Sequence, residues 1–180
     1  MAVIEAAAAL LAWSGAAVIV LSDGRRGLAL GLGLLTVGLA ALEWGDWLAV
    51  IAIFGGGTLA AWRRLRSGRP GWGLMPPGST PRMVLCVAAG LVALWVAVSV
   101  TTGPGVAVRF ATLTVIGLMT ARVLAGSHTT VVLTAVSALA LAMAAATGLG
   151  AMTPGPAPFI IGALIAAGVT VVPLTEPRAA

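Results

Sequence analysis

Long apolar runs, each ended by glycine, proline or charged residues, constrain this chain more than any other feature. A helix needs roughly 17 to 25 mainly apolar residues to cross a bilayer. In hydrocarbon the backbone must satisfy its own hydrogen bonds, which favours helices. The sequence predicts seven such segments, at about 3–21, 26–43, 46–62, 83–101, 106–125, 129–148 and 158–174.

The composition excludes an ordinary soluble domain. Only 8% of the 180 residues are charged and 60% are hydrophobic, whereas a soluble domain carries about 25% charged residues. The apolar segments extend along the whole chain, so neither a cleavable signal peptide nor a single anchor explains them. We therefore expect an all-α, polytopic transmembrane helix bundle of about seven spans.

The connections divide the chain into three helices, a long loop at 63–82, and four further helices. We interpret residues 1–180 as a single integral membrane domain with this 3 + 4 organisation. We find no convincing sequence repeat between the halves, such as a transporter's inverted repeat would give. Pro158 and Pro173 nearly bracket the last segment, which leaves a six-span form with a surface-lying tail open.

The arginines predict the orientation. With the N-terminus outside and the C-terminus in the cytoplasm, nine of the ten arginines fall on the cytoplasmic side, and only Arg109 falls outside, with Glu5, Glu43 and Asp46. Basic residues in short loops resist translocation, which is the basis of the positive-inside rule. We therefore interpret WRRLRSGRPGWG, at 62–73, as a determinant of topology rather than a nucleic-acid site.

The same stretch has a functional alternative. Arg63, Arg64, Arg66 and Arg69 are candidates for contact with anionic lipid or with an acidic surface of a partner at the cytoplasmic face. Arg109 is expected to extend to the outer surface, with pairing to Glu43 or Asp46, a lipid phosphate or an anionic substrate as the alternative. Arg122 is expected to extend to the cytoplasmic face.

Composition also limits the chemistry. Lysine is absent, which excludes a retinal or pyridoxal Schiff base, and one cysteine with one histidine cannot form a four-ligand zinc site. We expect no metal, no cofactor and no enzyme activity. Because Lys, Asn, Gln and Tyr are all missing while Ala, Gly, Arg and Pro abound, we expect a GC-rich bacterial source and the inner membrane as the location.

Glycines mark candidate packing sites. Gly27 and Gly31 are four residues apart and so lie on one helix face, where they allow close packing within the bundle or against another protein. Gly55, Gly56 and Gly57 interrupt a predicted span, which indicates close packing or a kink, or else a hinge or ligand approach. Glu43 and Asp46 are interpreted as a hairpin cap, with a cation site or an external partner contact as alternatives.

These features favour a non-catalytic membrane subunit, structural or accessory, in a larger membrane protein complex. The alternative is a small transporter or channel that acts alone or as a homo-oligomer. A buried ionisable residue would favour the alternative, and we place none within the predicted spans, where the ionisable groups fall near the ends.

Overall fold

The computed structural model describes residues 2–67, 70–76, 79–100, 105–126, 128–149 and 155–171. These form α1 (Ala2–Leu21), α2 (Arg25–Leu42), α3 (Trp47–Arg66), α4 (Thr80–Trp95) with a π-helical turn at Val96–Val100, α5 (Val106–Ala125), α6 (Thr129–Thr147) and α7 (Ala157–Val169). No strand is present in these ranges, where Ser22 and Leu74 form an isolated bridge. The all-α prediction is confirmed.

Six of the described helices, α1 to α6, are long and apolar enough to cross a membrane. Together they indicate a multi-pass membrane protein. The seventh, α7, has 13 residues and is about 20 Å long at 1.5 Å per residue. This is shorter than the roughly 30 Å hydrocarbon core. Thr170 and Val171 form a turn after the helix, and residues 172–174 of the predicted seventh span lie outside the described residues.

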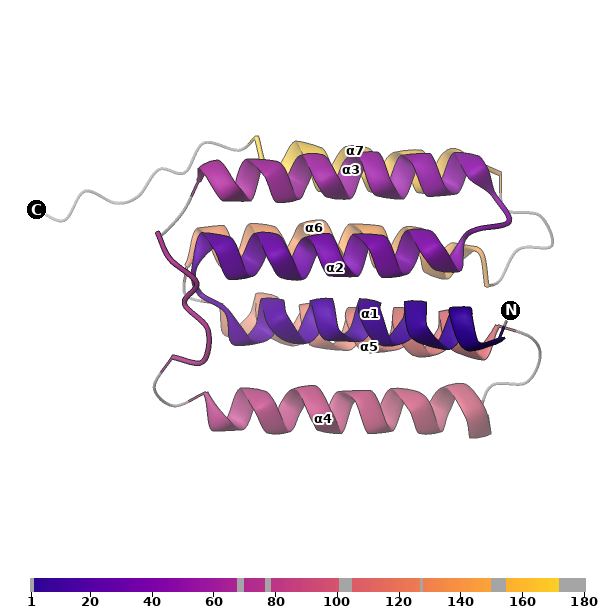
Figure 1. Ribbon diagram of the computed structural model, residues 1–180, viewed down its shortest axis with the longest axis horizontal. Coiled ribbons are helices and arrows are strands. Elements are labelled where there is room, and N and C mark those ends of the chain that lie inside the picture. Colours follow the sequence, from indigo (N-terminus) through magenta and orange to yellow (C-terminus); the bar gives the residue numbers. More distant parts are fainter. Residues whose placement is uncertain are drawn as a thin grey trace, which may run out of the picture.

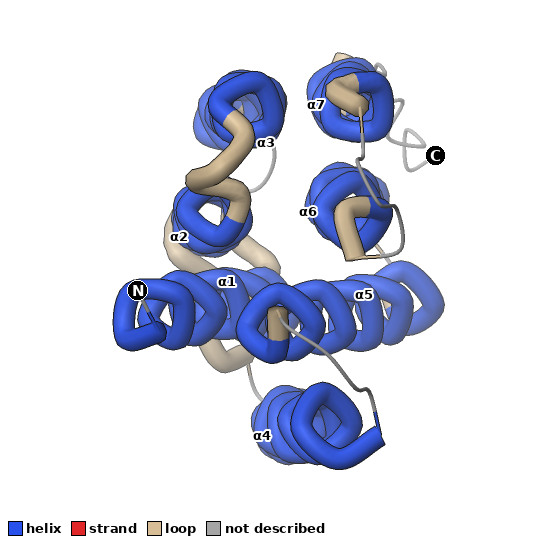
Figure 2. Tube along the Cα trace, turned by 90° about the vertical axis from the view of Figure 1, so that its right-hand side faces the viewer, coloured by secondary structure: helices blue, strands red, loops and turns tan. Residues whose placement is uncertain are grey.

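The helices form two stacked layers. One contains α1, α2 and α3 side by side, and the other contains α5, α6 and α7 in the same order (Figure 2). Across the layers α1 packs on α5, α2 on α6 and α3 on α7, while α4 packs outside against α1 and α5. Each helix of the first layer therefore lies beside one helix of the second layer and runs in the same direction as that helix (Figure 1).

Glycines permit the closest contacts within the first layer. A Cβ on Gly31 would lie 2.8 Å from the carbonyl oxygen of Gly15, and one on Gly38 would lie 2.5 Å from the backbone nitrogen of Ala12. Side chains at these positions would separate the two backbones, so small residues are needed for the contact between α1 and α2. Gly31 thus packs within the bundle, and Gly27 does so against Ser22 and the carbonyl of Trp72.

The triple glycine lies inside a continuous α3. A Cβ on Gly56 would meet the backbone of Ala163 in α7 at 2.7 Å, and one on Gly57 would overlap the Thr36 side chain in α2. Among the described residues, no atom of another helix lies within 4 Å of a Cβ on Gly55. Two of the three glycines therefore serve close helix packing.

The long predicted loop is shorter than expected at both ends. The sequence placed residues 63–82 in a loop, but α3 continues to Arg66 and α4 begins at Thr80. Arginine is a good helix former, and its charge is favourable in the last turn of a helix, so the helix continues beyond the apolar run. Arg63, Arg64 and Arg66 are therefore helical residues.

Candidate functional site

Seven described arginines gather at one end of the bundle, which we call the arginine end: Arg25, Arg26, Arg63, Arg64, Arg66, Arg82 and Arg122. Asp23, in the turn between α1 and α2, is the one acidic residue of the described chain at this end. The others, Glu5, Glu43 and Asp46, lie at the opposite end, which we call the carboxylate end.

The segment after α3 returns to the turn between α1 and α2. The backbone nitrogen of Asp23 donates to the carbonyl of Gly73 at 3.0 Å, and that of Arg26 donates to Gly71 at 3.2 Å. The second bond supplies an acceptor for one of the free N–H groups in the first turn of α2. Gly71 and Gly73 have positive φ angles of 100° and 54°, which a glycine adopts at little cost.

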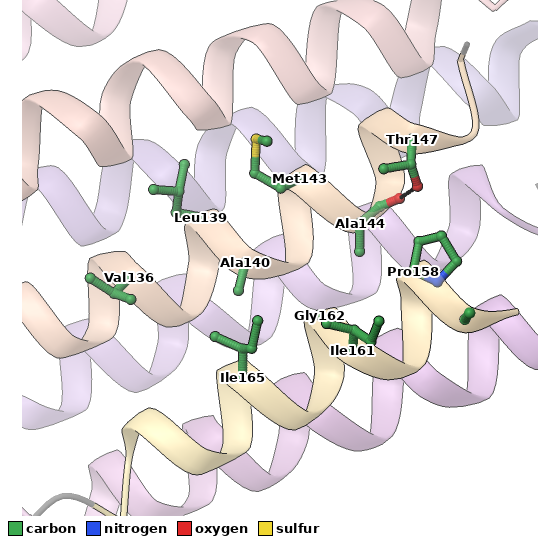
Figure 3. Close-up of a pocket in the computed structure, with 11 residues that line it drawn as sticks. Val136, Leu139, Ala140, Met143, Ala144, Thr147, Pro158, Ile161, Gly162 and Ile165 are labelled. Atoms are coloured by element: carbon green, nitrogen blue, oxygen red, sulfur yellow. Dashed lines mark hydrogen bonds between the residues drawn. The ribbon is translucent and has the colours of Figure 1, made fainter. Parts of the chain in front are cut away.

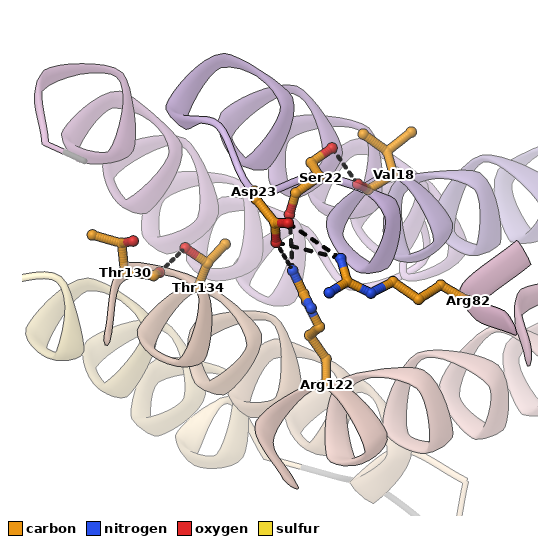
Figure 4. Close-up of polar contacts among 7 residues, drawn as sticks. All are labelled: Val18, Ser22, Asp23, Arg82, Arg122, Thr130 and Thr134. Atoms are coloured by element: carbon orange, nitrogen blue, oxygen red, sulfur yellow. Dashed lines mark hydrogen bonds and ion pairs between the residues drawn. The ribbon is translucent and has the colours of Figure 1, made fainter. Parts of the chain in front are cut away.

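Asp23 holds three elements together (Figure 4). Arg122, near the end of α5, donates to the Asp23 carboxylate and, at 3.0 Å, to the carbonyl of Ser22. Arg82, in the first turn of α4, pairs with the same carboxylate at 3.3 Å. One carboxylate thus joins the α1–α2 turn to both α4 and α5, and we call these three residues the Asp23 cluster.

The electrostatics of the cluster favour an ionised Asp23. Burial raises the pKa of this carboxyl, but the hydrogen bonds and charges of Arg122 and Arg82 outweigh burial, and the net pKa lies below its usual value. The expected extension of Arg122 to the surface is wrong, because its side chain is only 4% exposed and points to Asp23. The nearby carboxylate offsets part of the cost of burying this charge.

Arg64 is the most deeply buried charge of the described chain. It is 1% exposed and lies on the face of α3 that also carries Gly57 and Ala60, which packs toward the other helices. Its Nε and Nη2 have no hydrogen-bond partner among the described residues. An unpaired buried donor of a charged group is costly, so Arg64 is the residue of the bundle that most needs an external partner.

Arg63 and Arg66 lie beside Arg64 but on a more exposed face. They line a groove of about 390 Å³ at the ends of α3 and α7, together with Leu59, Trp62, Ser67 and Thr170. The Arg66 guanidinium lies 4.6 Å from the centre of the Trp62 ring, a cation–π contact. Of the four arginines predicted to act together, three lie in the last turn of α3, and Arg69 lies outside the described residues.

At the carboxylate end Asp46 is a helix cap. Its side chain accepts hydrogen bonds from the backbone nitrogens of Leu48 and Ala49, at 3.0 and 3.3 Å. This confirms the cap interpretation for Asp46. Such a cap satisfies two of the four free N–H groups of a helix start.

Glu43 follows the last residue of α2 and is partly buried beside the end of α6. Its Oε1 lies 3.9 Å from the position that a Cβ on Gly148 would take. Burial, with the neighbouring charge of Asp46, raises the pKa of Glu43 to about 7. Arg109 is partly buried in the first turn of α5.

The described residues contain no group of three or more His, Cys, Asp or Glu side chains that could hold a metal ion.

Sequence reasoning did not identify the Asp23 cluster. The available signal was that Asp23 occurs in SDGRR, between the first two predicted spans and on the side where arginines dominate. In the sequence, Arg82 is 59 positions and Arg122 is 99 positions away from Asp23. Only the packing order of the helices shows that Arg82 and Arg122 reach the same carboxylate.

No protein family model, curated protein or solved structure matches this chain.

Proposed function

We propose that this protein is a non-catalytic subunit of a larger membrane complex, in which it packs against the apolar helices of a partner. A groove of about 500 Å³ between α6 and α7 carries this proposal. Its lining is apolar apart from Thr147 and includes Ala140, Ala144 and Gly162 beside the larger Met143 and Ile161 (Figure 3). The small residues let α6 and α7 pack closely on each other, and the exposed Met143 and Ile161 flank an apolar groove that fits a partner helix.

The polar groups nearby are consistent with a packing role. Ser137, in α6, donates to the carbonyl of Leu133 in its own helix and to that of Ala166 in α7. Thr147 donates to the carbonyl of Ala144. These hydroxyls satisfy backbone acceptors of the bundle, which leaves the groove with an apolar surface suited to a partner helix.

The proposal includes a location and an orientation. We propose that the chain lies in a bacterial inner membrane, with the arginine end in the cytoplasm and in contact with anionic lipid. The gathering of seven arginines at that end supports this orientation, since basic residues are retained on the cytoplasmic side.

The test is gentle purification of the tagged full chain from its own membranes, followed by mass spectrometry of the proteins present in stoichiometric amount. We expect a larger membrane partner. Ala140→Leu, which fills the groove, should abolish its recovery. Ala88→Leu makes the same change on the exposed surface of α4 and should leave recovery unchanged. Recovery of the wild-type chain alone would overturn the proposal.

One observation favours the second candidate, a small transporter or channel. Arg64 is a buried ionisable residue within α3, and such residues often mark a substrate pathway. The sequence analysis instead placed Arg64 in the loop at 63–82. If the wild-type chain is recovered alone, uptake by vesicles that contain it tests this candidate, with Arg64→Met as the variant expected to lose transport.

A further inference from the structure

We propose that a groove on the outer face of α2 binds one anionic phospholipid, with an acyl chain along the groove and the phosphate at Arg26. The groove has a volume of about 550 Å³ and is lined by residues of α1, α2 and α3. This inference rests on the proposed contact of the arginine end with anionic lipid, and it does not require a partner subunit.

The floor of the groove is one face of α2. Four of its lining residues follow one another at intervals of four, three and four positions and so lie on one side of the helix: Arg26, Leu30, Gly33 and Val37. Leu30 and Val37 are exposed. Because α2 packs on α6 in the second layer (Figure 2), this exposed face turns away from that layer and toward the membrane.

The groove has the length of one lipid leaflet. The helix between Arg26 and Val37 is about 16 Å long at 1.5 Å per residue. Half of the roughly 30 Å hydrocarbon core is about 15 Å. An acyl chain that extends from a headgroup at Arg26 to the middle of the membrane therefore fits the groove.

Gly33 makes room in the middle of this face. Among the described residues, no atom of another element lies within 4 Å of a Cβ on Gly33, whereas a Cβ on Gly31 or Gly38 would overlap the backbone of α1. Glycine is a poor helix former, and helix packing does not require it at position 33. The missing side chain instead deepens the groove along the path of the acyl chain.

The start of α2 lacks a counter-charge. Its first turn carries Arg25 and Arg26 and no acidic residue, although the N-terminal end of a helix is already positive. Asp23 precedes the helix but pairs with Arg82 and Arg122, and the described residues provide no ion-pair partner for Arg26. A phosphate at Arg26 supplies the missing negative charge and accepts hydrogen bonds from the guanidinium.

Trp72 completes the headgroup end of the groove. Its two neighbours, Gly71 and Gly73, accept backbone hydrogen bonds from Arg26 and Asp23 at 3.2 and 3.0 Å, which hold Trp72 beside the start of α2. Trp72 lines the groove together with Arg26 and is half exposed. Tryptophan favours the depth of lipid headgroups, so these two side chains mark the level of the phosphate.

The experiment uses the purified full chain in uncharged detergent. Phosphatidylglycerol, which is anionic, and phosphatidylcholine, which is zwitterionic, are added in equal amounts, and native mass spectrometry counts the molecules of each that remain bound. We expect the wild-type protein to retain one phosphatidylglycerol in preference to phosphatidylcholine. The measurement requires only this chain, so its outcome is separate from the recovery of a partner subunit.

Two variants test the headgroup contact and the acyl-chain contact. Arg26→Gln should lower the preference for phosphatidylglycerol by about fivefold, which corresponds to about 1 kcal/mol for one arginine near an anionic headgroup. Gly33→Leu fills the middle of the groove and should abolish retention of the lipid. Because a Cβ at this position has open space, Gly33→Leu is expected to fold, which its unfolding midpoint checks.

Two matched controls lie outside the groove. Arg63→Gln removes one charge from the arginine end, and Gly117→Leu adds the same side chain at an exposed, open position of α5. Both should change retention by less than about twofold. An equal loss in Arg63→Gln, unchanged retention in Gly33→Leu, or equal affinity of the wild type for the two lipids would overturn the proposal. A dimer that Gly33→Leu disrupts would place a second copy of the chain in the groove and would also overturn it.

Discussion

Asp23 concentrates several interactions in one side chain. It accepts from two arginines of different helices, and one of them, Arg122, is 4% exposed. A buried cation depends strongly on its counter-charge, because the loss of one partner leaves an uncompensated charge in an apolar environment. At this scale the stability of the bundle depends on one carboxylate at its arginine end.

Asp23→Asn should lower the free energy of unfolding by about 2 to 3 kcal/mol, since Arg122 would keep its charge and lose its partner. Thermal or denaturant unfolding in detergent at pH 7 measures this. The control is Asp46→Asn at the other end, where asparagine caps a helix about as well as aspartate. Equal effects of the two substitutions would contradict the assigned role of the Asp23 cluster.

The pH dependence at Asp23 follows from its lowered pKa. A carboxyl whose pKa is depressed by folding contributes stability above its unfolded value and loses that contribution as the pH falls through the folded value. The usual value for aspartate is 3.8. The difference between wild type and Asp23→Asn should therefore be full at neutral pH and decline only in acid below that value.

Glu43 should show the opposite sign. Its pKa is raised to about 7 in the folded protein, from 4.5. Between these two pH values the carboxyl ionises in the unfolded protein but stays protonated in the folded one, so the free energy of unfolding falls as the pH rises. The full loss is reached above pH 7. Glu43→Gln should stabilise the protein at pH 8 by on the order of 1 kcal/mol after solvent screening, and much less at pH 4.5. The exposed Glu5→Gln is the control; a constant difference at every pH would contradict this role of burial.

Helices in this bundle approach each other most closely at glycines, and the triple glycine of α3 shows how specific this is. Gly56 and Gly57 contact α7 and α2, whereas no described atom of another helix lies within 4 Å of a Cβ on Gly55. Three identical residues in sequence thus have different roles. A composition rich in alanine and glycine hides this difference, because only the packed neighbours show which glycine is required.

Gly56→Ala should destabilise the protein by about 1 to 3 kcal/mol, because the new methyl group would overlap the backbone of Ala163 and force the helices apart. Gly55→Ala should be neutral or stabilising by up to about 1 kcal/mol, since alanine favours a helix and has open space there. Unfolding midpoints of the two variants provide the comparison. Equal destabilisation would indicate that Gly55 is also constrained, for example as a hinge.

The sequence was sufficient to predict the helices and most of their ends, because hydrophobic length and turn residues report them directly. It did not predict the end of α3, where backbone hydrogen bonds continue past the apolar run to Ser67. It also did not predict the burial of Arg64 and Arg122. Hydropathy places an arginine near a membrane surface, but only tertiary packing decides whether its side chain turns outward or inward.

At the scale of the whole molecule, the two layers repeat the order and direction of three helices, with α4 outside them (Figure 2). The odd number of elements places the described start of α1 and the end of α7 at opposite ends of the bundle (Figure 1). The arginine end and the carboxylate end are therefore separated by the full length of the helices. This arrangement gives the topology a simple test.

Reporter fusions after residue 24 or 72 should report the cytoplasm, and a fusion after residue 45 should report the outside, as expected from the arginines at one end. Fusions after residues 155 and 180 should report opposite sides if α7 crosses the membrane despite its 13 residues. The reverse pattern for the first three would overturn the orientation. If the fusions after residues 155 and 180 report the same side, the protein has six spans.

The Asp23 cluster also sets an order of events during synthesis. Asp23 leaves the ribosome 59 residues before Arg82 and 99 residues before Arg122. At roughly 5 to 20 residues per second, the wait for the second arginine lasts on the order of 5 to 20 s. During that time the first hairpin is inserted with its carboxylate incompletely neutralised. Arrival of α5 completes the ion pairs, so the early helices of this protein reach their final state only after more than half of the chain has been translated.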